Sequence, residues 1–114
     1  MSLEKRINAF VELGNFMRQF SRQKIKKNSA VLYNDLFFEA FTSQIKRAKE
    51  FNGWFTEENI LFAFEKWSNQ LTKNKLDNWT SIYNLDNNTP KTIADIMAGN
   101  IPLVGFHDFL SVLL

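Results

Sequence analysis

The sequence of 114 residues contains no cysteine. Disulfide bonds, thiolate metal sites and thiol nucleophiles are therefore excluded from anything that this chain does unaided. Its four glycines form neither a Gly-x-Gly-x-x-Gly pattern nor a phosphate-binding loop. The chain thus lacks the common fingerprints of nucleotide binding through a glycine-rich turn.

Long apolar runs and a strong net charge are also missing. No stretch approaches the roughly 20 apolar residues of a membrane-spanning helix, and the amino terminus has no apolar region typical of a secretory signal. The 14 basic and 12 acidic side chains leave a net charge of only +2. The single basic run, 22–27, is interpreted as a solvated loop and not as a nucleic-acid patch. We therefore expect a cytoplasmic protein with no membrane span and no nucleic-acid partner.

Apolar residues are plentiful, at 45% of the chain with 12 phenylalanines and 3 tryptophans, which is enough for one core. Apolar side chains spaced three and four residues apart predict an amphipathic helix over 3–20. Its stripe contains Leu3, Ile7, Phe10, Gly14 and Met17. This face is expected to be buried.

Three further helices are predicted before residue 86. The second runs over about 29–49, capped by Asn28 or Ser29, and Asn52-Gly53 is expected to supply a left-handed stop. Its apolar positions are Leu32, Leu36, Phe37, Ala40, Phe41, Ile45 and Ala48. Thr56, followed by two acidic residues, predicts the start of the third. The buried face of that helix is expected to contain Ile60, Phe64, Trp67 and Leu71. A shorter helix is expected around 76–83.

The pattern changes after the turn-forming residues 86–90. Residues 92–98, Thr-Ile-Ala-Asp-Ile-Met-Ala, predict a short strand buried inside a parallel sheet. Asp95 is costly there unless it has a partner or the strand is less enclosed. Pro102 suits the first position of a helix over 103–114. The predicted fold is mostly α with a short C-terminal strand, an α+β fragment.

The predicted strand has no sheet partner, because no other segment of the sequence predicts a strand. The sequence also stops inside an apolar helix without a cap. We interpret these features as truncation of a longer chain. An open strand edge and an uncovered apolar helix predict that the 114 residues self-associate.

Three segments carry a resemblance to a known family. The most specific is 99–108, Gly-Asn-Ile-Pro-Leu-Val-Gly-Phe-His-Asp, and segments 3–10 and 52–56 accompany it. They are similar to the acyl-CoA reductases, the long-chain fatty-acid reductases related to luminescence systems, which belong to the aldehyde dehydrogenase superfamily. The resemblance implies a helical N-terminal region over 1–90. It also implies that 91–114 begin a truncated NAD(P)-binding α/β unit, as the first strand, turn and helix of an aldehyde-dehydrogenase-like nucleotide-binding domain.

The same resemblance implies roles for four residues. Asn100, in an Asn-Ile-Pro turn, would donate its side-chain amide to the oxyanion that forms when a cysteine thiolate adds to a thioester. The backbone of Met97, Ala98 and Gly99 would line the nicotinamide side of the cofactor groove. No metal ligand set is implied.

The implied reaction is the reduction of a fatty acyl-CoA to its aldehyde with NADPH or NADH, through a cysteine thioester. Because this chain has no cysteine, we expect the 114 residues alone to be inactive and to bind no cofactor.

Other interpretations stay open. Asn100 by itself is typical of a turn. His107 is interpreted as a packed residue and not as a proton carrier. The aromatic residues of the predicted helices are interpreted as core and not as an acyl-chain pocket. A different class of function is a standalone helical module that binds a partner through the apolar helix 103–114.

Overall fold

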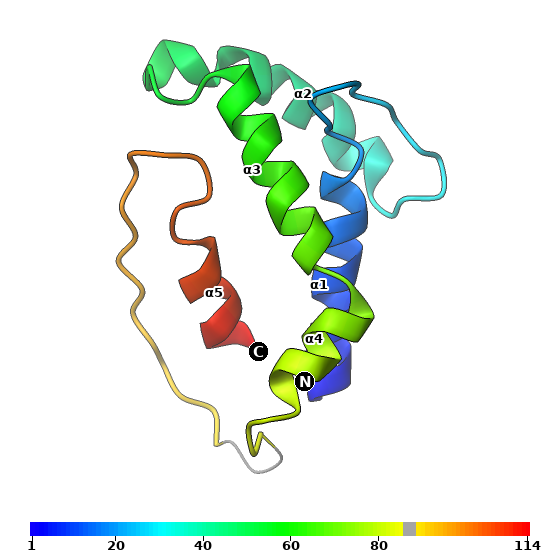
Figure 1. Cartoon of the computed structure of the whole chain (residues 1–114), viewed down its shortest axis with the longest axis vertical. Coiled ribbons are helices and arrows are strands. Elements are labelled where there is room, and N and C mark those ends of the chain that lie inside the picture. Colours follow the sequence, from blue (N-terminus) through cyan, green and yellow to red (C-terminus); the bar gives the residue numbers. More distant parts are fainter. Residues whose placement is uncertain (86–88) are drawn as a thin grey trace.

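A computed structural model of the chain describes residues 1–85 and 89–114. Within these ranges lie five helices: α1 (Leu3–Met17), α2 (Asn34–Phe51), α3 (Glu57–Gln70), α4 (Lys73–Thr80) and α5 (Phe106–Leu113). Helix α1 packs against α3 and α4, and α2 packs against α3, as Figure 1 shows. The described part of the chain is mostly helical, which confirms that part of the predicted fold.

Helix α1 presents the predicted face to the core. Ile7, Phe10, Gly14 and Met17 are all buried. The helix ends at Met17 and not at Phe20, because the chain turns back there: Phe20 forms an antiparallel β-bridge with Ile25. The spacing therefore predicted the buried side of this helix correctly and its end too late.

Gly14 lets α1 approach the end of α3 closely. A Cβ atom at this position would lie 2.5 Å from the carbonyl oxygen of Leu71 and 2.7 Å from its Cβ. Leu71 is fully buried. Only glycine fits this contact without displacing backbone, so Gly14 sets the distance between the two helices.

The core centres on Phe20, whose side chain has no exposed area. Its ring lies 5.2 Å from that of Phe38, 5.3 Å from Phe16, 5.5 Å from Phe41 and 6.0 Å from Phe64. Edge-to-face and offset arrangements at these distances stabilise aromatic clusters. Phe20, three residues beyond the end of α1, thus joins α1, α2 and α3.

Helix α2 begins at Asn34, later than predicted. The residue before it, Tyr33, has a φ of 63°, which interrupts any helical path from Ser29. Ile45 is buried as predicted, but in the first turns Phe38 is buried whereas Leu36 is 69% exposed. The apolar spacing chosen from the sequence therefore marked the wrong side of the first turns of α2.

The end of α2 and the start of α3 are capped by the residues of the turn between them. The end of α2 lies at the predicted Asn52-Gly53, but the left-handed conformation is wrong, because Asn52 has a φ of −148° and among the described residues no glycine has a positive φ. Instead Asn52 caps α2, with its backbone N–H donating to the carbonyl of Ala48. Thr56 is confirmed as the N-cap of α3, since its Oγ1 accepts a hydrogen bond from the Asn59 backbone N–H at 3.2 Å.

The predicted strand over 92–98 is not confirmed. These residues are exposed and form no hydrogen-bonded ladder with another part of the described chain. Backbone donors and acceptors of a strand need a neighbour, and here the segment runs extended along the outside of the helices (Figure 1). Asp95 is exposed and so carries no burial cost. The first part of the predicted turn, 86–88, lies outside the described residues.

Helix α5 begins at Phe106, so Pro102 is not its first residue. Leu103 has a φ of 59°, and this left-handed residue separates Pro102 from the helix. Among the described residues, no helix is long and apolar enough to cross a membrane.

Candidate functional site

An apolar pocket of about 260 Å³ contains three of the four predicted site residues. Met97, Ala98 and Gly99 form part of its wall, and Phe55 faces them from the turn before α3. The remaining lining residues come from the turn and helix that follow: Ile101, Leu103, Val104, Gly105, Phe106 and Phe109. Asn100, the fourth predicted residue, lies between two lining residues and is exposed.

The turn after α2 holds one wall of this pocket. The Nδ2 of Asn52 donates a hydrogen bond to the carbonyl of Gly99 at 3.1 Å, across 47 residues of sequence. The Oδ1 of the same side chain accepts from the backbone N–H of Trp54 at 3.0 Å. The carbonyl of Asn52 accepts from the N–H of Phe55 at 2.9 Å. Asn52 therefore shapes its own turn and fixes the segment that contains Gly99.

The opposite wall is a tight turn that leads into α5. The N–H of Phe106 donates to the carbonyl of Leu103 at 3.0 Å. At Gly105 a Cβ atom would lie 2.7 Å from the Cβ of Met97 and closer still to its sulfur. Glycine at this position thus makes room for the Met97 side chain, so the two walls are in direct contact.

The base of the pocket is anchored in the core by α5. The ring of Phe106 lies 4.7 Å from that of Trp67 on α3, and the ring of Phe109 lies 6.0 Å from that of Phe10 on α1. Phe106 and Leu110 are buried. The pocket is therefore attached to α1 and α3.

Asn100 makes no side-chain hydrogen bond with any other described residue. Its amide is exposed on the turn between Gly99 and Ile101. The structure places it beside Met97, Ala98 and Gly99 in the chain and brings no thiol near it, since the sequence has no cysteine. The site offers a hydrogen-bond donor and an apolar wall without a nucleophile of its own.

Sequence reasoning missed the parts that Asn52 and Phe55 play at this pocket. The segment 52–56 carried part of the resemblance, which was the available signal. Nothing in the local sequence indicates that Asn52 contacts Gly99, because the two lie far apart in the chain.

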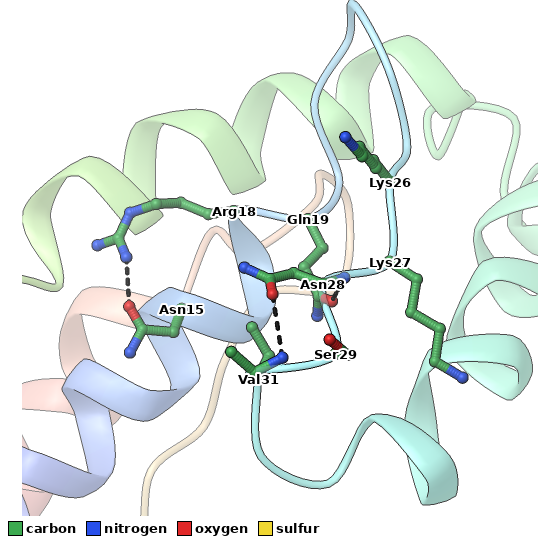
Figure 2. A pocket seen from close by; sticks show the side chains of 9 residues that line it. Asn15, Arg18, Gln19, Lys26, Lys27, Asn28, Ser29 and Val31 are labelled. Carbon is green, nitrogen blue, oxygen red and sulfur yellow. Dashed lines mark hydrogen bonds between the residues drawn. The ribbon is translucent and has the colours of Figure 1, made fainter.

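A larger polar pocket of about 740 Å³ lies where the loop 20–33 leaves α1 (Figure 2). Its cationic side chains do not converge. The Arg18 guanidinium donates to the carbonyls of Ser68 at 2.9 Å and Leu71 at 3.2 Å, at the end of α3. Lys27 extends away from Arg18 in Figure 2 and lies 3.8 Å from Asp35. The Arg18 guanidinium thus joins the end of α1 to the end of α3, and Lys27 is paired with Asp35, so these charges do not form an anion site.

The basic run is partly neutralised. Arg22 and Glu65 form an ion pair with 2.9 Å between Nη2 and Oε2. The backbone N–H of Arg22, together with its side chain and the Ser21 hydroxyl, lowers the pKa of the Glu65 carboxyl. These contacts support the interpretation of 22–27 as a structural loop.

His107 is not a packed residue, and that interpretation is wrong. Its side chain is 66% exposed, with Nδ1 3.8 Å from the Asp108 carboxylate. The ring centroid lies 6.0 Å from that of Trp79. Neighbouring residues of a helix point in different directions, so Phe106 faces the core and His107 lies at the surface.

Comparison of the chain with models of known protein families, with curated proteins and with solved structures finds no match.

Proposed function

We propose that this chain forms the amino-terminal part of an acyl-CoA reductase, which reduces a fatty acyl-CoA to the aldehyde with NADPH or NADH. The observation that carries the proposal is the contact between two segments that bear the resemblance, 52–56 and 99–108. Asn52 donates to Gly99 at 3.1 Å, and Phe55 lines the same pocket as residues 97–99. Segments that are similar to one family in sequence thus meet in space, which supports a shared role.

In this proposal Asn100 is the oxyanion donor. Its amide lies on a turn whose preceding residue is held by Asn52, and within the described residues no acceptor occupies it. A donor that is positioned before the reaction stabilises developing charge without reorganisation. That is the physical reason for preferring an oxyanion role to a purely structural one.

The cofactor proposed for the parent enzyme supplies a hydride when bound. The apolar wall formed by Met97, Ala98 and Gly99 fits one flat ring, since the pocket measures about 260 Å³. Pockets that enclose drug-sized ligands span roughly 300–1,000 Å³. A whole dinucleotide therefore needs further contacts from segments outside these 114 residues, and we expect no cofactor binding by this chain alone.

The proposed reaction needs a cysteine that this chain does not contain. A thiolate adds to the thioester carbonyl, the Asn100 amide donates to the oxyanion, and the CoA thiolate leaves. A hydride then adds to the carbon of the resulting acyl-cysteine, and the aldehyde departs as the cysteine thiolate re-forms. The 114 residues alone are thus proposed to be inactive.

The test is to express the whole reading frame that contains these residues and to assay it with a fatty acyl-CoA and NADPH. We expect aldehyde to form while the absorbance of the reduced cofactor falls. Asn100→Ala should lower kcat about 100- to 1,000-fold, the usual effect of losing one oxyanion donor. Asn74→Ala, at an exposed position of α4, is the matched control and should leave kcat unchanged.

Two results would overturn the proposal. The first is an Asn100→Ala variant that reduces acyl-CoA as fast as the parent. The second is aldehyde formation by the 114-residue chain itself, because a chain without cysteine cannot follow a thioester route.

A second candidate is a helical module that recognises a protein partner, including another copy of itself, through α5. Phe109, Val112 and Leu113 are 40%, 40% and 42% exposed, so the helix keeps an uncovered apolar side. Light scattering at increasing protein concentration tests this. We expect self-association that Phe109→Asp abolishes, and a monodisperse monomer at all concentrations would contradict it.

A further inference from the structure

Residues 89–100 form an extended arm that leads to α5 along the outside of the helices (Figure 1). Every residue of the arm is exposed, including Ile93 at 55% and Ile96 at 97%. Among the described residues the arm makes a single hydrogen bond, which the Asn52 side chain donates to the Gly99 carbonyl. Extended backbone with unpaired donors and acceptors, next to exposed β-branched side chains, is a template for pairing with another strand.

The contacts that hold α5 do not depend on which chain supplies the helix. Phe106 packs on Trp67 of α3 with the ring centroids 4.7 Å apart, and Phe109 packs on Phe10 of α1 at 6.0 Å. A second copy presents the same surfaces, so exchange of α5 between two copies keeps these contacts. An extended chain covers about 3.3 Å per residue, so the arm spans about 40 Å, close to the 44 Å longest dimension of the molecule. The arm is therefore long enough to carry α5 to a neighbouring copy.

We propose that two copies of this chain exchange residues 89–114, so that each α5 packs on the α1 and α3 of the other copy and the two arms pair as an antiparallel ribbon. Because monomer and dimer share the α5 contacts, the ribbon is what the dimer gains. It provides partners for backbone groups of the arm that have none in the described monomer. The run 92–98, whose sequence predicts a strand, then pairs with the same run of a second copy. The exchange does not rest on the proposed reductase function.

The charges of the arm favour one register of the ribbon. In an antiparallel ribbon with a two-fold axis, a register centred on Ile93 places each Lys91 opposite Asp95 of the other copy. Opposite charges that face each other across two strands stabilise the pair, whereas a register centred on Asp95 would place two carboxylates opposite each other. Within the described monomer neither Lys91 nor Asp95 forms an ion pair. Both charges are thus available to a second copy.

The exchange is tested directly with engineered cysteines, because the parent chain has none. Ala9 and Leu113 are exposed and line one cavity between α1 and α5. The double variant Ala9→Cys, Leu113→Cys is separated into monomer and dimer by gel filtration at high protein concentration, and each fraction is treated with a short bismaleimide reagent. On a denaturing gel we expect links within one chain from the monomer and links between two chains from the dimer.

Two outcomes of this experiment would overturn the exchange. The first is a dimer fraction whose links all lie within single chains, since association through the exposed side of α5 leaves each α5 on its own core. The second is a parent chain that stays monomeric at every concentration.

The ribbon is tested in the exposed arm, where substitutions leave the packing of the helices unchanged. Lys91→Glu places like charges across the ribbon at two symmetric positions and should raise the dimer dissociation constant about tenfold. The double variant Lys91→Glu, Asp95→Lys restores opposite charges and should dimerise as the parent does. Lys49→Glu makes the same charge change at an exposed position of α2 and should have no effect.

Sedimentation equilibrium measures these dissociation constants. The ribbon is overturned if Lys91→Glu dimerises as well as the parent, or if the double variant is as weak as the single one. None of these results bears on aldehyde formation by the whole reading frame, so this proposal and the reductase proposal fail separately.

Discussion

The side-chain amides of Gln19 and Asn34 bind each other through two hydrogen bonds. Gln19 Nε2 donates to Asn34 Oδ1 at 2.8 Å, and Asn34 Nδ2 donates to Gln19 Oε1 at 2.7 Å. Both residues are 5% exposed. The same amides also bind the backbone of Asn28, whose N–H donates to Gln19 and whose carbonyl accepts from Asn34. This buried network joins the loop 20–33 to the end of α1 and the start of α2.

We predict that Asn34→Ala destabilises the fold by about 1–3 kcal/mol, because it removes three hydrogen bonds, two of them between the buried side chains of Asn34 and Gln19. Urea unfolding followed by circular dichroism measures the effect. Asn69→Ala, at an exposed position of α3, should change the free energy of unfolding by less than about 0.5 kcal/mol. Equal stability of the two variants would show that the network contributes nothing.

Gly14→Ala should destabilise the protein by about 1–3 kcal/mol, even though alanine is the better helix former. The added methyl group meets the Leu71 carbonyl at 2.5 Å, and a backbone atom cannot move aside cheaply. Gly53→Ala is the control, because nothing lies within 4 Å of a Cβ there. Thermal melts measure the Tm of both variants. A Gly14→Ala protein that melts at a higher temperature than the parent would contradict the close contact between Gly14 and Leu71.

Tyr33→Asn should stabilise the protein by roughly 0.5–1 kcal/mol, since Tyr33 has a φ of 63° and asparagine tolerates that conformation better. The substitution also loses an edge contact with the Phe37 ring at 6.5 Å. Tyr83→Asn loses a similar contact, with the Trp79 ring at 6.5 Å, without a left-handed backbone. Urea unfolding should therefore give a higher free energy of unfolding for Tyr33→Asn than for Tyr83→Asn. An equal loss of stability in both variants would show that the left-handed conformation of Tyr33 is not strained.

The stability contributed by Glu65 should depend on pH. Its pKa is lower in the folded state than the ordinary 4.5, chiefly because the Arg22 backbone N–H donates to the carboxylate. The contribution is therefore fully present above pH 4.5 and is lost as the pH falls through the lower folded value. Urea midpoints of the parent and Glu65→Gln should differ at pH 7 and converge towards pH 3. A gap between the two midpoints that stays constant from pH 7 to pH 3 would exclude the linkage.

Local patterns in the sequence predicted the fold where local interactions decide it. The spacing of Ile7, Phe10, Gly14 and Met17 predicted the buried face of α1, and the hydroxyl of Thr56 predicted the start of α3. The start of α2 depends instead on a buried amide pair between residues 15 apart, which no local pattern reveals. Short-range periodicity also could not show that the apolar run 92–98 lies exposed, since apolar character and burial are separate properties.

The candidate site was predictable only in part. Residues 97–99 were identified through a resemblance, and the structure adds Phe55 and Asn52 to them. Those additions depend on how α2 ends, because the Asn52 side chain can reach Gly99 only after the turn at 52–55 has formed. The roles of Asn100 and of the nicotinamide cofactor stay proposals.

The contacts that attach the carboxyl-terminal segment determine how this segment opens in the folded protein. Residues 89–105 meet the helices through the hydrogen bond from Asn52 to Gly99, while α5 docks through Phe106 and Leu110. Such a segment opens as one cooperative unit at a lower free energy than the core around Phe20. Amide hydrogens of α5 should therefore exchange with solvent before those of α1 and α3. Each opening uncovers Phe10 and Trp67 while the rest of the bundle stays folded.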